Sequence, residues 1–281
     1  MTHSLSLIAP AKLNLNLYVN EKLKNGYHSL ESDICFLDLH DTIDIRLSNL
    51  NKIKISKDSS FFLKDENILF KTLNYFNSEF KNNDKYNITL KKNIPIGAGL
   101  GGGSSDSAAL LLGLRYFYNK NPNNEKKISF RKLKEIGLKI GSDVPACIVG
   151  KSLKLSGIGE KLKTINIAKD NKFLVIYPNK TLSTKKVFDN FILKKLKDAK
   201  PMYFDNIKIF NSLENVSQSI EPEIKKILNI LKSFEKIIAF GMSGSGSSCF
   251  GIFKNSRDLI YDKEFVRLKS KNNYFIWHGN K

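Results

Sequence analysis

A run of glycines carries the clearest chemical signal in this chain of 281 residues. Five of the seven residues from 97 to 103 are glycine: Gly97, Gly99, Gly101, Gly102 and Gly103. Glycine lets the backbone adopt positive φ and approach a ligand closely. The run leads through Ser104, Ser105 and Asp106 into an apolar stretch typical of a helix, whose N-terminus offers N–H groups and partial positive charge. A tight turn with a helix cap needs only one or two glycines, so the run predicts a loop that binds a polyphosphate and its metal.

Two better-known nucleotide motifs fit this chain poorly. Gly97, Gly99 and Gly102 match the dinucleotide fingerprint, but the acidic residue expected about 20 residues later falls in a polar loop near Pro122. The segment at 150–152 resembles the end of a Walker loop, but Pro145 occupies the position of its first glycine. We therefore expect neither a dinucleotide site nor a Walker loop.

The elements that must position this loop follow from the apolar periodicity. Alternation predicts strands at 13–19, 34–39, 42–47, 53–55 and 86–90, and helical spacing predicts helices at 67–80 and 129–140, the second capped by Ser129. In the second half we expect strands at 173–177, 237–240, 248–253 and 274–277, and helices at 184–197, 222–233 and 257–270. The pattern predicts an α+β protein in two parts, each with a glycine loop, the second at 241–246.

Composition excludes several classes of protein. Apolar residues make up 41% of the chain, enough for a packed core. No apolar run approaches the roughly 18 residues of a spanning helix. Cys35, Cys147 and Cys249 are odd in number and far apart, which is typical of a reducing compartment. We expect a cytoplasmic protein, and not a secreted miniprotein, a membrane protein or a zinc ribbon.

The net charge of +19 raises the question of nucleic-acid binding. Only five of the 46 basic residues are arginine, which leaves 41 lysines, and the chain also has 29 asparagines. A phosphate-reading protein favours arginine for its bidentate geometry. We therefore expect a solvated surface whose field attracts a phosphorylated small molecule, with no nucleic acid or membrane as partner.

Three motifs occur in an order that resembles the GHMP small-molecule kinases, which include galactokinase, homoserine kinase and mevalonate kinase. They are Pro10-Ala11-Lys12-Leu13-Asn14-Leu15, the segment Pro95–Ala109, and the segment Gly241–Phe253. Two further motifs, Asn25-Gly26-Tyr27-His28 and Gly141-Ser142-Asp143-Val144-Pro145, are similar to one branch of the family. That branch phosphorylates the 2-hydroxyl of 4-diphosphocytidyl-2-C-methyl-D-erythritol in non-mevalonate isoprenoid biosynthesis. The resemblance extends from about residue 8 to 253.

The resemblance implies a fold, two cofactors and a set of site residues. The fold is α+β, with an N-terminal ribosomal-protein-S5-like domain at 1–160 and a ferredoxin-like domain at 161–281. The cofactors are ATP and Mg²⁺, the partner is the small-molecule substrate, and the oligomeric state is left open. The implied catalytic residues are Lys12 and Asp143, as cation and base. The implied nucleotide-binding residues are Asn67, Lys92, Pro95, Ile96, Gly97, Ala98, Gly99, Leu100, Gly101, Gly102, Gly103, Ser104 and Ser105, of which Ser105 is also the candidate metal ligand. The implied substrate-binding residues are Asn14, Tyr27, His28, Asp143, Phe188, Gly244, Ser245 and Gly246.

Several alternatives stay open at this point. Asp143 fits a simple helix cap, and Phe188 fits the core face of a helix. The chain departs from the family at Ser247-Ser248, where Pro-Thr is common, and at Ser212, where aspartate is usual. Another GHMP kinase, acting on homoserine or mevalonate, is the alternative enzyme. A basic RNA-binding protein with an S5-like domain is the alternative from another class.

Overall fold

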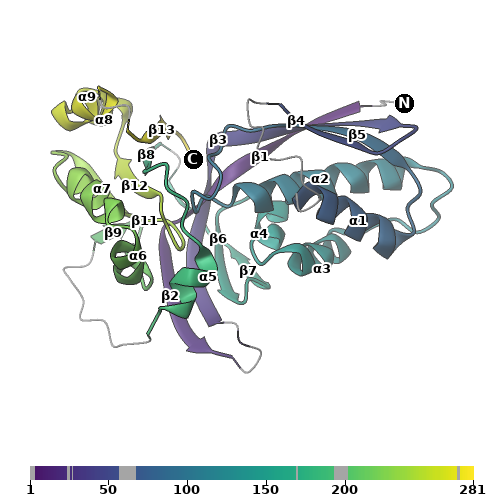
Figure 1. Ribbon diagram of the computed structural model, residues 1–281, viewed down its shortest axis with the longest axis horizontal. Helices are drawn as coiled ribbons and strands as arrows, with labels where there is room; N and C mark the ends of the chain where they lie inside the picture. The colour runs from purple at the N-terminus through teal and green to yellow at the C-terminus, as the bar shows by residue number, and fades with distance from the viewer. Residues whose placement is uncertain are drawn as a thin grey trace. The chain divides into compact units, whose positions relative to one another are not determined.

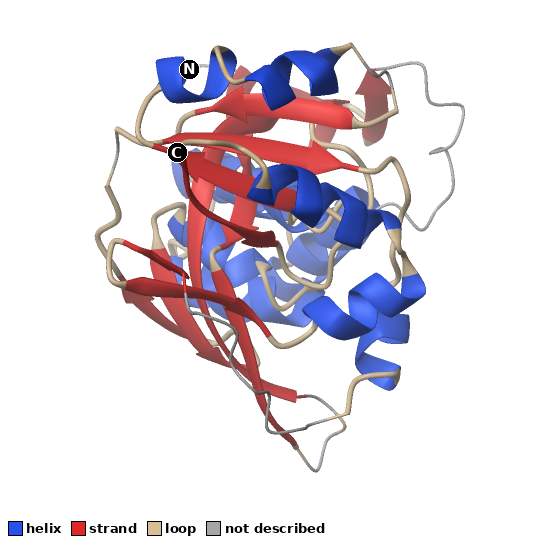
Figure 2. Cartoon of the chain, turned by 90° about the vertical axis from the view of Figure 1, so that its left-hand side faces the viewer, coloured by secondary structure: helices blue, strands red, loops and turns tan. Residues whose placement is uncertain are grey.

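The computed structural model describes residues 4–23, 26, 28–56, 68–168, 170–192, 202–270 and 273–281. The chain forms two compact units, each assembled from separate segments. The first unit comprises Met1–Ala11, His40–Ile94 and Gly101–Gly150, and the second comprises Lys12–Leu39, Pro95–Leu100 and Lys151–Lys281. The contiguous domains expected at 1–160 and 161–281 remain a prediction. The chain contains both helices and strands in runs of one to four elements (Figure 2), and the expected α+β class is confirmed.

In the first unit, four helices pack beside a small sheet (Figure 1). The last part of β3 (His28–Ser48) pairs antiparallel with β5 (Lys85–Lys91), and β4 (Lys52–Ser56) pairs parallel with β5. Alternate β5 residues, among them Ile88 and Leu90, are buried, as the period of a strand with one buried face requires. The helices are α1 (Ile68–Phe80), α2 (Gly102–Lys120), α3 (Phe130–Ile140) and α4 (Val144–Val149).

The second unit contains two groups of strands. One group holds the end of β1 (Ser4–Asn14), β2 (Asn16–Lys22), the first part of β3, β6 (Leu153–Gly157), β7 (Lys161–Thr164), β9 (Met202–Phe204) and β10 (Ile207–Asn211). The other is an antiparallel sheet in the order β11 (Ile237–Met242), β12 (Cys249–Phe253), β8 (Lys172–Tyr177) and β13 (Phe275–Gly279). The helices of this unit are α5 (Thr184–Asp189), α6 (Glu214–Ile220), α7 (Glu223–Lys232), α8 (Ser256–Ile260) and α9 (Lys263–Lys269).

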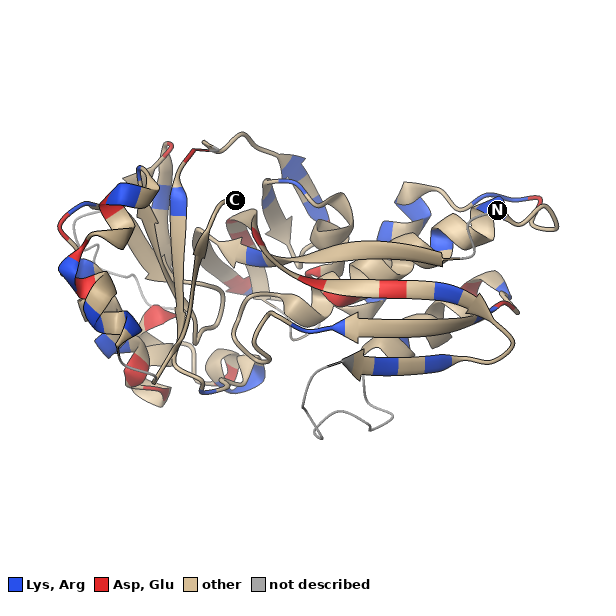
Figure 3. Ribbon diagram, turned by 90° about the horizontal axis from the view of Figure 1, so that it is seen from above, with Lys and Arg blue, Asp and Glu red and all other residues tan. Residues whose placement is uncertain are grey.

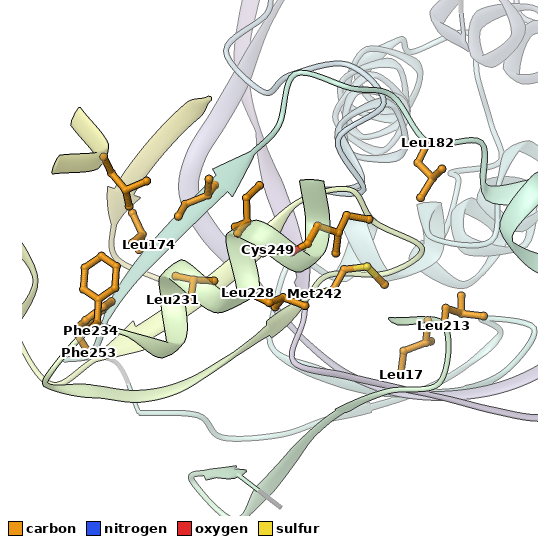
Figure 4. Close-up of a cluster of buried hydrophobic side chains, with 14 of the residues drawn as sticks. Leu17, Leu174, Leu182, Leu213, Leu228, Leu231, Phe234, Met242, Cys249 and Phe253 are labelled. Carbon is orange, nitrogen blue, oxygen red and sulfur yellow. The ribbon is translucent and has the colours of Figure 1, made fainter. Parts of the chain in front are cut away.

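An apolar cluster in the second unit joins the helices to this four-stranded sheet (Figure 4). Leu228 and Leu231 of α7 pack with Leu174 of β8 and with Cys249 and Phe253 of β12. Burying a side chain of this size stabilises the fold by about 1.5–3 kcal/mol. The cluster therefore fixes the sheet whose β11–β12 turn carries the second glycine run.

The main surprise in the secondary structure is that β3 is one strand of 21 residues. The sequence predicts two strands separated at His40-Asp41, and this prediction is wrong. Asp41 is fully buried inside the strand, and its carboxylate accepts hydrogen bonds from the backbone N–H groups of Asn93 and Ile94. An aspartate satisfied in this way does not need a turn.

Other boundaries also differ from the prediction. The single helix expected at 257–270 is two short helices, because Asp262 caps α9 by accepting a hydrogen bond from the N–H of Glu264 at 2.9 Å. The helix expected at 184–197 ends at Asp189 as α5, and residues 193–197 lie outside the described part of the chain. Six short elements were not predicted, and each is seven residues or shorter: α4, α6, β6, β7, β9 and β10.

Basic and acidic residues are interleaved along the helices α7 to α9 (Figure 3). The lysines and arginine there form ion pairs that join 226 to 223, 236 to 258, 263 to 235 and 267 to 264, at 2.5–3.9 Å. Such exposed pairs are worth about 0–1 kcal/mol each. None of the helices in the described ranges is both long and apolar enough to cross a membrane.

Candidate active site

The loop from Pro95 to Gly101 leads into α2, as the sequence predicts for a phosphate-binding loop. We call it the phosphate loop. Gly97, Gly99 and Gly101 have φ values of 68°, 75° and 65°, a region that favours glycine. Gly101 is the N-cap of α2 and has no side chain that could bind the N–H groups of the first turn. Those groups have no acceptors inside the helix. The start of α2 therefore offers the N–H groups and partial positive charge that suit a phosphate chain.

The implied nucleotide-binding residues fall in both units. Pro95, Ile96, Gly97, Ala98, Gly99 and Leu100 belong to the second unit, and Lys92, Gly101, Gly102, Gly103, Ser104 and Ser105 belong to the first. Asn67 lies outside the described residues. Ser105, the candidate metal ligand, is buried in the first turn of α2.

Two glycines of the loop lie so close to other segments of the same chain that a side chain at either position would collide with them. A Cβ on Gly99 would stand 2.3 Å from the carbonyl oxygen of Gly246, and one on Gly97 would stand 2.3 Å from Cγ2 of Thr181. The N–H of Ser248 also donates to the carbonyl of Ala98 at 3.1 Å. The first half of the phosphate loop is therefore packed against the second glycine run.

Lys92 lies in a buried ionic cluster of the first unit. Its ammonium donates to a carboxylate oxygen of Asp41 and, at 2.9 Å, to Oδ2 of Asp106. Burial, together with the charge of Asp41, raises the pKa of Asp106 to about 7 despite the opposing effect of Lys92. Burial alone would lower the pKa of Lys92, but the charges of Asp106 and Asp41 outweigh it and raise that pKa. Because Asp106 lies on α2 and Asp41 binds the N–H groups of Asn93 and Ile94, the cluster links the start of α2 to the segment before the loop.

Lys12 and Asn14, two residues apart on β1, point the same way, as strand geometry requires. The ammonium of Lys12 donates to Oδ1 of Asn14 at 2.7 Å, and Nδ2 of Asn14 donates to Oγ of Ser32 at 2.8 Å. All three side chains are at least 95% buried. The backbone N–H of Lys12 donates to the carbonyl of Leu100 at 2.8 Å, which ties this strand to the phosphate loop. The structure therefore brings together a buried cation, an oriented amide and the end of the loop.

The second glycine run meets the same strand. We call residues 243–248 the serine–glycine loop. Oγ of Ser243 accepts from the N–H of Asn14 and donates to the carbonyl of Gly99, both at 3.2 Å. A Cβ on Gly244 would stand 3.3 Å from Oδ1 of Asn14. Ser245 bonds the hydroxyl of Thr184 at 2.9 Å. The implied substrate residues Gly244, Ser245 and Gly246 thus lie in one loop that also contacts Asn14.

His28 and Phe188, separated by 160 residues in the sequence, form a stacked pair. Their ring centroids are 5.2 Å apart with an interplanar angle of 29°. Phe188 is also partly buried against the apolar cluster. It therefore makes the core contact that the sequence allowed as the alternative to base binding. Burial, followed by the charge of Lys22, lowers the pKa of His28, which keeps the imidazole neutral near pH 7. Tyr27 lies outside the described residues.

Asp143 lies in the first unit at the N-cap position of α4, directly before Val144 and Pro145. Its side chain is partly exposed and makes no capping hydrogen bond with the helix. Asp143 is thus the N-cap residue of α4 by position, but its side chain does not make the hydrogen bond of a capping aspartate.

This chain is similar in sequence to known kinases. The family model for the N-terminal domain of GHMP kinases matches residues 67–151, and the model for the C-terminal domain matches residues 194–264. A protein from Clostridioides difficile named 4-diphosphocytidyl-2-C-methyl-D-erythritol kinase is 34% identical over 280 residues, covering 95% of this chain and 92% of the relative. A protein of the same name from Clostridium botulinum is 37% identical, covering 90% and 93%.

The chain belongs to the GHMP kinase family.

Solved structures of GHMP kinases share the fold. A crystal structure of 4-(cytidine 5'-diphospho)-2C-methyl-D-erythritol kinase has a TM-score of 0.79 at 24% identity and covers 98% of both chains. The homoserine kinase of Cytophaga hutchinsonii has a TM-score of 0.68 at 13% identity, covering 100% of this chain and 96% of that one. The two-domain α+β fold implied by the motifs is thereby confirmed.

Several residues that hold this GHMP kinase site together were not predicted from the sequence. The sequence places Asp41 between two expected strands, and Ser32 lies in a strand with no motif. Ser243 was part of the third motif but was not singled out. Asn211 donates to the carbonyls of Met242 and Gly244. In the sequence it stands directly before Ser212, where the chain departs from the family's usual aspartate. For Asp41, the signal was a charged residue in the middle of strand-like alternation.

Proposed function

We propose that this chain transfers the γ-phosphoryl group of ATP to the 2-hydroxyl of 4-diphosphocytidyl-2-C-methyl-D-erythritol, giving the 2-phosphate and ADP. The observation that carries the proposal is the match, at 34–37% identity over 90–95% of the chain, to proteins named for that reaction. The geometry of the two glycine loops and of Lys12 supports it.

The phosphate loop has the backbone geometry that suits the phosphates of a nucleoside triphosphate. Its positive-φ glycines leave no side chain between the backbone and a ligand, and the N–H groups of the first turn of α2 lack acceptors within the helix. The described residues contain no cluster of three or more His, Cys, Asp or Glu that could hold a metal. Mg²⁺ is typically held in kinases by few protein ligands plus phosphate oxygens, and the hydroxyl of Ser105 is the candidate protein ligand. When bound, Mg²⁺ would neutralise charge on the phosphate oxygens.

The proton of the acceptor hydroxyl needs a destination, and Asp143 supplies it in this proposal. A carboxylate within hydrogen-bond reach of the hydroxyl accepts the proton as the bond to phosphorus forms. Lys12 supplies the cation that stabilises negative charge developing during phosphoryl transfer. Asn14 holds the ammonium of Lys12, and Ser32 holds the amide of Asn14, so the cation is oriented before substrate arrives.

The cytidine base is the group that distinguishes this substrate from those of other GHMP kinases. In this proposal, the pyrimidine stacks on the ring pair that His28 and Phe188 form with each other. A neutral imidazole has one donor and one acceptor nitrogen, which suits the mixed donor and acceptor edge of cytosine. Tyr27, next to His28, is the further aromatic candidate.

An acceptor panel tests the proposal. ADP release is measured with Mg-ATP and, in turn, diphosphocytidyl methylerythritol, mevalonate, homoserine and galactose. We expect turnover with the cytidyl compound alone. Turnover with mevalonate or homoserine instead would keep the phosphate loop and refute the role of His28 and Phe188. Tight, strongly salt-dependent RNA binding without ATP turnover would favour the RNA-binding alternative.

A further inference from the structure

Asn211, at the end of β10, makes a dense set of buried hydrogen bonds in the second unit. Its Nδ2 donates to the carbonyl of Met242 at 2.9 Å and to the carbonyl of Gly244 at 2.8 Å, and its Oδ1 accepts from the N–H of Leu213 at 2.9 Å. The residue is only 9% exposed. Both hydrogens of the amide are thus used on the two carbonyls that flank Ser243.

Ser243 connects two parts of the site. Its hydroxyl accepts from the N–H of Asn14 and donates to the carbonyl of Gly99, and the residue is fully buried. One hydroxyl thereby joins the strand that carries Lys12 to the loop implied to bind ATP. Its direction depends on the backbone of residues 242–244, which Asn211 holds from both sides.

Glycine has little conformational preference of its own, so hydrogen bonds must fix a glycine-rich turn. Gly244 and Gly246 have φ values of 59° and 88°. The other side chains that donate to carbonyls in this region act further along or outside the loop: Ser217 binds the carbonyl of Ser245, and Ser247 binds that of Lys180. Asn211 instead donates to the carbonyls on both sides of Ser243.

We propose that Asn211 is a positioning residue for phosphoryl transfer. It fixes residues 242–244 so that the hydroxyl of Ser243 can bond both Asn14 of β1 and Gly99 of the phosphate loop. We call Asn211 and Ser243 together the clamp. The inference rests on the proposed function, because its kinetic effect presupposes that these two segments bind acceptor and ATP. Displacement of a reacting group by about 1 Å costs on the order of 100-fold in rate, so loss of the clamp has a large kinetic effect.

The test compares Asn211→Ala, Ser243→Ala and the double variant by kcat and KM for ATP and for diphosphocytidyl methylerythritol. Asn82→Ala is the matched control, because Asn82 is 8% exposed and its amide also makes two bonds, to Oδ1 of Asn77 at 2.9 Å and to the hydroxyl of Tyr86 at 3.3 Å, in the first unit. The unfolding midpoint of each variant is measured, and kinetics are run well below it. A loss of stability alone then affects Asn82→Ala and Asn211→Ala alike.

We expect kcat/KM to fall about 10- to 100-fold in each single variant of the clamp. The kcat/KM of the double variant should lie within about threefold of that of the less active single variant, because one residue acts through the other. The proposal is overturned if Asn211→Ala stays within about threefold of wild type, if the two losses multiply, or if Asn82→Ala loses as much.

Two further readouts keep the test decisive. Ser243→Ala removes one oxygen only, so if Asn211→Ala does not fold, wild-type kcat/KM in Ser243→Ala overturns the proposal. Absence of turnover in wild type would refute the proposed function instead. Titration with a non-hydrolysable ATP analogue would then test the clamp, with weaker binding expected in Asn211→Ala and equal binding overturning it.

Discussion

Replacing Gly99 by alanine should break the contact between the phosphate loop and the serine–glycine loop. Gly99 has a φ of 75°, and its backbone faces the carbonyl of Gly246. Gly150 is a matched control, because its φ is 61° but the nearest atom to an added Cβ, the carbonyl oxygen of Cys147, is at 3.7 Å, an ordinary contact. Gly99→Ala and Gly150→Ala therefore share the backbone strain and differ in the collision.

The magnitude of the effect has two parts. An alanine in left-handed backbone costs about 1–2 kcal/mol, and both variants lose that much stability. In Gly99→Ala, the new Cβ would also stand 2.3 Å from the oxygen and 2.9 Å from the carbon of the Gly246 carbonyl. Carbon atoms in contact stay about 3.5 Å or more apart, so one loop must shift by about 1 Å. A shift of this size lowers catalytic rate on the order of 100-fold.

The assay is steady-state ADP release with varied ATP, alongside urea unfolding of both variants. We expect kcat/KM for ATP to fall about 100-fold in Gly99→Ala and to stay within about threefold of wild type in Gly150→Ala. If Gly99→Ala retains wild-type kcat/KM, the packing of the two loops does not matter for catalysis. If both variants lose activity equally, backbone strain and not the collision is responsible.

Three other outcomes follow from the site. His28→Ala and Phe188→Ala should each raise KM for the cytidyl acceptor about 10-fold, because stacking on a base is worth about 1–3 kcal/mol, and leave KM for ATP unchanged; an acceptor KM equal to that of wild type in both variants would contradict the stacking role. Lys92→Met leaves the carboxylates of Asp41 and Asp106 buried without a cation and should lower the free energy of unfolding by about 3–5 kcal/mol in urea, whereas a loss below about 1 kcal/mol would show that the cluster is not a buried ion pair. The pKa of Asp106 is raised from 3.8 to about 7, so between these values the folded chain binds more protons than the unfolded chain, and this group destabilises the fold increasingly as pH rises. Asp106→Asn should therefore gain free energy of unfolding relative to wild type from pH 5 to pH 8 in urea titrations, and a constant difference would refute the raised pKa.

The local parts of the fold and site could be predicted from the sequence. The phosphate loop follows from five glycines before a helix, and the cap of α3 follows from Ser129, whose Oγ accepts from the N–H of Lys132 at 3.2 Å. The common orientation of Lys12 and Asn14 follows from strand geometry. Each of these depends only on neighbours in sequence.

The long-range parts could not be predicted in this way. The bond from Asn14 to Ser243 joins residues 229 positions apart, and nothing in a strand of alternating residues indicates which distant hydroxyl will meet it. The sequence predicts a break between strands at Asp41 because a charged side chain is costly in a buried strand, unless the fold supplies partners. Those partners, Lys92 and two backbone N–H groups, come from a segment about 50 residues away.

The most direct test of the account is a single-turnover measurement with γ-labelled ATP, Mg²⁺ and excess wild-type protein or Asp143→Asn. The account predicts that wild type transfers the label to the 2-hydroxyl of diphosphocytidyl methylerythritol. In Asp143→Asn, the rate should fall by about 100- to 10,000-fold while the protein keeps its fold and its affinity for the ATP analogue. Transfer at a comparable rate in Asp143→Asn, or label found on another hydroxyl, would contradict it.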